Sequence, residues 1–89
     1  MSRFIVIHSA APQMTQDQVI DSARRLVASL PPETEWLNSW WIPGEVQRLF
    51  CEWEALDSKA LRAALEPVTR LLPIESIHEA QWIDPQWYK

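Results

Sequence analysis

The chain has 89 residues, one cysteine and a formal net charge of −4. Its length predicts one small domain over residues 1–89, and its acidic balance argues against a nucleic-acid partner, because phosphate binding needs a basic surface. One cysteine excludes an intrachain disulfide, and the apolar run from Phe4 to Ile7 is too short for a signal peptide or a membrane span. We therefore expect a cytoplasmic protein without a membrane partner.

The first half of the chain begins with a strand-like run and continues with a helix-like run. Arg3 to His8 is apolar and β-branched, which predicts a central strand buried on both faces. Thr15 and Gln18 have the spacing of a capping box, and apolar residues then recur at helical spacing. We expect a helix over Thr15 to Leu30, which Pro31-Pro32 ends.

Two alternating runs, Thr34 to Ile42 and Val46 to Glu54, flank the Pro43-Gly44 turn. This pattern is typical of a β-hairpin. In the first run, Trp36, Trp40 and Ile42 share one parity and Leu37 and Trp41 share the other, so we expect both faces to be largely apolar. In the second run we expect one parity to lie under the helices and the other to face outward. The first set is Leu49, Cys51 and Trp53, and the second is Val46, Arg48, Phe50, Glu52 and Glu54.

The last part of the chain predicts a second helix and a final strand. Asp57 or Ser58 is the expected N-cap of the helix. Pro67 lies inside the apolar pattern and predicts a kink or an end near Glu66. The final strand is expected over Glu75 to Ile83.

The resulting order, β-α-β-β-α-β, is the ferredoxin-like arrangement of the α+β class. It predicts a four-stranded antiparallel sheet in the order 4-1-3-2, with two helices on one face. The other face then stays uncovered, and large exposed apolar patches are rare on monomers. We therefore predict a homodimer in which the uncovered faces meet as an α+β barrel.

Six tryptophans lie in or beside the strand-like runs. One interpretation is packing in the core and in an interface. The other is an aromatic-lined ligand pocket between the sheet and the helices. The candidates for a pocket or an interface are Trp40, Trp41, Phe50, Trp53 and Trp82.

Two histidines and one glutamate are the candidates for a metal site. His8, Glu52 and His78 offer two imidazoles and a carboxylate, a set that suits nickel, zinc or non-haem iron. No compact metal motif joins them, so the alternative is two ordinary strand histidines and a solvated glutamate. Cys51 is expected to be an inert, buried thiol.

The chain also resembles a family of small ferredoxin-like proteins that includes a streptomycete nickel-binding protein. The segments that carry the resemblance are Trp36-Leu37-Asn38-Ser39-Trp40, Phe50-Cys51-x-Trp53-x-Ala55, Ala60-Leu61-Arg62, Pro73, Ile77, Glu79 and Ile83-Asp84-Pro85. The resemblance implies a dimeric α+β barrel with nickel binding. The resemblance also implies departures: many relatives carry an acidic residue in place of Ile7, and several carry histidines in place of Asn38 and of Ala63 or Ala64, which argues against metal binding by this chain.

The sequence therefore favours a small dimeric binding protein for nickel, another divalent metal or a small apolar ligand. One alternative is a cofactor-free monooxygenase or isomerase of the dimeric α+β barrel type, which needs a pocket with a histidine or carboxylate of shifted pKa. The other alternative is a structural interaction module, which needs no pocket.

Overall fold

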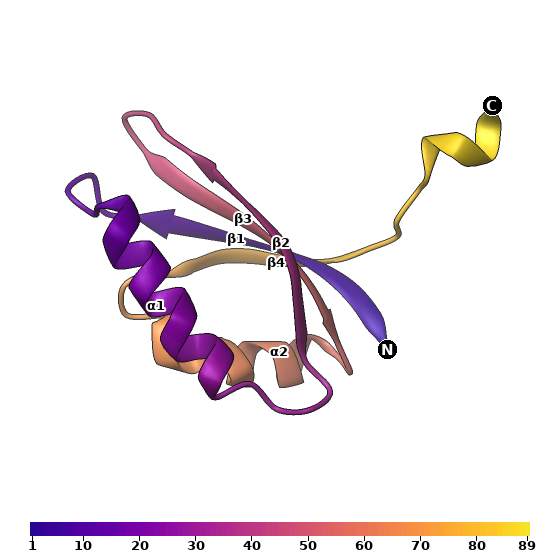
Figure 1. Cartoon of the computed structure of the whole chain (residues 1–89), viewed down its shortest axis with the longest axis horizontal. Helices are drawn as coiled ribbons and strands as arrows, with labels where there is room; N and C mark the ends of the chain where they lie inside the picture. The colour runs from indigo at the N-terminus through magenta and orange to yellow at the C-terminus, as the bar shows by residue number, and fades with distance from the viewer.

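The computed structural model describes residues 1–89 and confirms the predicted element order. The strands form one antiparallel sheet in the order β2-β3-β1-β4, and both helices lie on the same side of it (Figure 1). The elements are β1 (Ser2–Ala10), α1 (Gln16–Ala28), β2 (Glu35–Ile42), β3 (Gln47–Ala55), α2 (Ser58–Leu65), β4 (Ile74–Ala80) and two short 3-10 helices, Glu66–Val68 and Pro85–Tyr88. Neither α-helix is long and apolar enough to cross a membrane.

Local signals in the sequence set the ends of both helices. Thr15 accepts from the Gln18 backbone N–H at 3.2 Å, and the Gln18 side chain accepts from the Thr15 N–H at 2.8 Å, so the capping box is confirmed. Asp57 caps α2 by accepting from the Ala60 N–H at 2.7 Å. α2 ends at Leu65 and passes into a 3-10 turn that contains Pro67, as expected for a proline that cannot continue the α-helix.

The side chains on the two faces of the sheet differ in how deeply they are buried. In β1 the residues that point to the helices are buried, and those that point away are only half-buried. β3 alternates in the same way, which confirms the two predicted sets. The helix-covered face supplies Phe4, Val6, Leu49 and Trp53 to the core, where they meet helix residues such as Leu26, Leu61 and Leu65. We call the other side of the sheet the open face.

A β-bulge in β2 changes which tryptophans share a face. Trp36 pairs with Trp53, and Asn38 pairs with Glu52, which directly precedes Trp53 in β3. Leu37 is therefore an extra residue in β2 without a partner in β3. Trp36 therefore lies on the helix-covered face, whereas Trp40 lies on the open face opposite Phe50. The sequence alternation placed Trp36 and Trp40 on one side, and this was wrong because the bulge shifts the alternation by one residue.

The last strand is shorter than predicted. β4 ends at Ala80, which pairs with Arg3 near the start of β1, so the residues after it have little strand left to pair with. The chain then leaves the sheet as the C-terminal arm, residues 81–89, which projects from the body (Figure 1). Within the arm, Trp82 and Trp87 pack edge to face at 5.4 Å between ring centroids, and both are more than half exposed.

Candidate functional site

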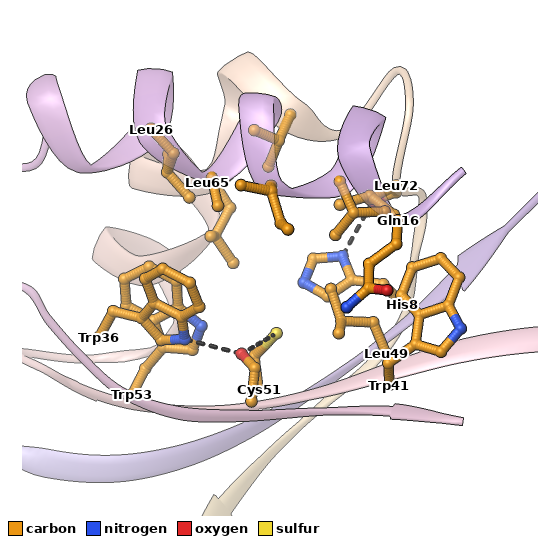
Figure 2. A pocket seen from close by; sticks show the side chains of 15 residues that line it. His8, Gln16, Leu26, Trp36, Trp41, Leu49, Cys51, Trp53, Leu65 and Leu72 are labelled. Carbon is orange, nitrogen blue, oxygen red and sulfur yellow. Dashed lines mark hydrogen bonds between the residues drawn. The ribbon is translucent and has the colours of Figure 1, made fainter. Parts of the chain in front are cut away.

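A cavity of about 290 Å³ lies between α1 and the helix-covered face of the sheet (Figure 2). Twelve of its 15 lining residues are hydrophobic, and no lysine, arginine, aspartate or glutamate is among them. Val19, Ala23 and Leu26 of α1 form one wall, and Trp41, Leu49 and Trp53 lie on the sheet side. A concave, mostly apolar site with a few polar groups is the usual form of a small-molecule pocket.

His8 supplies one of these polar groups. Its side chain is only 2% exposed, because His8 continues the buried alternation of Phe4 and Val6 along β1. Nδ1 donates to the Leu72 carbonyl at 2.9 Å, which leaves Nε2 as the acceptor of the neutral ring. Burial lowers the pKa of His8, and the bond to Leu72 opposes this shift only in part. In Figure 2 the free ring nitrogen faces the cavity.

Trp53 supplies a second polar group at the other end of the cavity. Its ring stacks on Trp36 at 6.1 Å between centroids, with 20° between the planes. Trp53 is 2% exposed, and its Nε1–H is a buried donor without a hydrogen-bond partner. Trp36 differs, because its Nε1–H donates to Ser39 Oγ at 2.7 Å.

Cys51 lies in the wall between these two ends. Ser39 Oγ donates to Cys51 Sγ at 3.0 Å, so the chain of bonds runs from Trp36 through Ser39 to the thiol. Burial raises the pKa of Cys51 to about 11, with the Ser39 bond acting against it. The thiol is thus protonated at neutral pH and is a weak nucleophile and metal ligand.

The three predicted metal ligands are not brought together. His8 points to the helices, whereas Glu52 and His78 lie on the open face, where each pairs with Ile5 from opposite sides of β1. Glu52 is already engaged, because Arg3 lies 3.5 Å away and Asn38 donates to it at 2.9 Å. No group of three or more His, Cys, Asp or Glu side chains is placed to hold a metal ion.

The predicted aromatic residues divide between the two faces. Trp41 and Trp53 line the cavity, whereas Trp40 and Phe50 lie opposite each other on the open face. Trp82 lies beyond β4, with the Arg3 guanidinium 5.8 Å from its ring centroid. The five residues therefore include both pocket and surface positions.

Of the 15 lining residues, only His8, Trp41 and Trp53 were predicted as site residues, and the missed ones include Trp36, Ser39 and Gln16. The bulge hid the relation between the first two, because simple alternation puts Trp36 and Ser39 on opposite faces whereas the structure places both on the helix-covered face. Gln16 begins α1 and carries no distinguishing pattern in the sequence. A signal did exist for His8, since a polar residue on the apolar parity of a strand is a candidate for a pocket.

Comparison with known proteins identifies the family. The family model described as "Nickel responsive protein SCO4226-like" matches residues 4–80. The chain belongs to this family. Among solved structures, SCO4226 from Streptomyces coelicolor A3(2) is similar, with a TM-score of 0.77, 19% sequence identity, and coverage of 93% of this chain and 100% of that one. No curated protein matches.

The residues of one chain do not fit a nickel ion, although the SCO4226-like family is named for nickel. Nickel prefers several imidazole, thiolate or carboxylate donors at one point. Here the imidazole of His8, the protonated thiol of Cys51 and the paired carboxylate of Glu52 lie apart, on two faces. Ile7 and Asn38, two positions at which the resemblance predicts ligating groups in relatives, both lie on the open face.

Proposed function

We propose that this chain is a binding protein for a small, mostly apolar molecule held in the cavity between α1 and the sheet. The observation that carries the proposal is the cavity itself, which is predominantly hydrophobic and has two side chains in its lining with a free polar atom. Trp53 Nε1 is a buried donor without a partner, and His8 Nε2 makes no hydrogen bond within the chain. A purely structural module would gain stability from filling this volume, because empty space in a core costs packing energy.

Binding is better supported than catalysis. The cavity holds one base, His8, and a second titratable group, Cys51, whose pKa of about 11 makes it a poor nucleophile. General acid–base chemistry usually needs two groups with different proton affinities near the reacting atoms. The lining contains no carboxylate that could be the partner of His8.

Naphthalene is a suitable probe for this proposal, because it is apolar and small. We expect saturable binding of one molecule per chain in isothermal titration calorimetry. Ala23→Leu adds volume to the α1 wall of the cavity, and we expect it to weaken the affinity by about tenfold or more. Ala28→Leu is the matched control, because Ala28 is exposed near the end of the same helix. Failure of the unmodified chain to bind naphthalene or any of its polar derivatives would contradict the proposal.

A divalent-metal role is the second candidate, and family membership favours it. Its test is the nickel content of untagged protein after incubation with nickel and gel filtration, measured by inductively coupled plasma mass spectrometry. One nickel ion per chain, or per pair of chains, would support this candidate. Protein that retains no nickel would remove it.

We also propose that two copies associate through their open faces as an α+β barrel. The support is the apolar surface that one chain leaves on this side, with Trp40 54% and Ile42 45% exposed beside the half-buried Phe50. The exposed C-terminal arm offers further apolar surface to a second copy. The single buried thiol suits a reducing compartment, so we place the protein in the cytoplasm.

A further inference from the structure

The cavity has two polar ends with opposite requirements. His8 pairs with Leu49, and Trp53 pairs with Phe4, so the two side chains start four residues apart along the β1–β3 ladder, about 13 Å by strand geometry. Figure 2 shows them on opposite sides of the space under α1. Cys51 of β3 lies between them, and apolar side chains of α1, such as Leu26, line the space above the sheet.

Hydrogen-bond roles at both ends are fixed. Because His8 Nδ1 donates to Leu72, Nε2 has a lone pair and needs a donor. The indole N–H of Trp53 donates only, and it has no acceptor. Buried polar groups are nearly always paired in folded proteins, so each unpaired atom needs an explanation. A ligand with a donor at one end and an acceptor at the other satisfies both atoms at once.

We propose that the ligand of this cavity is an uncharged two-ring molecule with a hydroxyl donor at the His8 end and a carbonyl acceptor at the Trp53 end. The inference rests on the proposed function and names the class of molecule for the same cavity. The size follows from volume, because a cavity of about 150 Å³ holds benzene and this one is about twice as large. The lack of charge follows from the lining, which contains no ionic side chain to pair with one.

Four naphthalene derivatives separate the contributions of the two ends. Naphthalene carries neither group, 2-naphthol carries the donor, 2-acetonaphthone carries the acceptor, and 6-hydroxy-2-acetonaphthone carries both. Isothermal titration calorimetry on the full chain gives the four affinities. We expect each polar group to strengthen binding by about tenfold, because each pairs a buried atom that is otherwise unsatisfied.

Two variants assign each gain to its residue. His8→Asn keeps an amide N–H near the position of Nδ1, so the bond to Leu72 is retained while the Nε2 acceptor is lost. In this variant the affinity ratio of 2-naphthol to naphthalene should fall from about ten to about one. Trp53→Phe removes the indole N–H and keeps an aromatic ring beside Trp36, so the ratio of 2-acetonaphthone to naphthalene should fall in the same way.

The outcomes distinguish failure of the proposed binding function from failure of the inference about the polar ends of the cavity. If naphthalene and its derivatives all fail to bind the unmodified chain, the proposed function fails. If all four bind with equal affinity, the cavity binds apolar molecules but the inference about its polar ends is wrong. Unchanged ratios in the variants would likewise overturn it. Should a variant not fold, the ¹⁵N signal of His8 Nε2 in the unmodified protein decides, because 2-naphthol should shift it and naphthalene should not.

Discussion

The two faces of the sheet differ in their exposure to solvent. On the helix-covered face, Val6 and Trp53 are almost completely buried and a cavity remains beneath α1. On the open face, neighbouring residues of the same strands, such as Ile5 and Glu52, are half-buried and lie beside exposed Trp40. Because side chains alternate along a strand, a shift of a single residue decides whether a side chain faces the cavity or the open face.

The comparison also explains why the metal hypothesis loses support while the pocket hypothesis gains it. His8 belongs to the covered face, where burial keeps the imidazole neutral and frees Nε2 for a ligand. His78 and Glu52 belong to the open face, where Glu52 pairs with Arg3 and Asn38. Residues that look like one ligand set in the sequence thus serve two different surfaces.

The largest expected effect comes from a charge on the open face. Phe50→Asp should weaken self-association by about a hundredfold or more, because a carboxylate would have to be desolvated in the interface. Multi-angle light scattering should then report monomer or unfolded chain. Leu71→Asp is the control, because Leu71 is exposed in the loop before β4. A variant that stays fully dimeric would mean that copies meet through another surface.

Truncation of adjacent residues in β1 tests the two faces separately. Val6→Ala should lower the free energy of unfolding by about 2 kcal/mol at every protein concentration, because Val6 is 0% exposed within one chain. If two copies associate as proposed, Ile5→Ala should have an effect that depends on protein concentration, because Ile5 lies on the open face. Urea unfolding at two concentrations measures both. Equal, concentration-independent losses would argue against an open face covered by a second copy.

The buried His8 predicts a pH dependence of stability. Its pKa is lowered in the folded chain, so the unfolded state binds the proton more readily and stability falls as pH drops below about 6.5 toward the folded-state pKa. In that window the slope should be at most about 1.4 kcal/mol per pH unit. Urea unfolding between pH 7.5 and pH 5 measures it. His8→Asn should flatten the curve, and His78→Gln is the control on the opposite face.

The smallest effect is expected at the ion pair of the open face. Glu52→Gln removes the charge that faces Arg3 at 3.5 Å, and the free energy of unfolding should change by less than about 1 kcal/mol. Glu45→Gln is the control, because Glu45 is exposed in the turn between β2 and β3, away from Arg3. Unfolding at low and high salt measures the difference between the two variants. A loss above about 3 kcal/mol would instead show that the pair is desolvated in an interface.

The sequence alone determined the element order, the helix caps and the face of each β3 residue. Thr15, Gln18, Asp57 and Pro67 act on groups within four residues of themselves, so their effects are readable without a fold. The alternation of β3 is also local, because successive side chains of a strand point to opposite faces.

Tertiary structure decided which residues face each other across the strands and across the cavity. The bulge at Leu37 moved Trp36 to the covered face, because it depends on how β2 pairs with β3 and not on β2 by itself. The separation of His8 from Glu52 and His78 depends on the register of three strands, and a slip of one residue would reverse it. The cavity depends on how α1 rests on the sheet, since its walls come from segments far apart in the chain. Local patterns fix local structure, whereas register and packing are properties of several segments together.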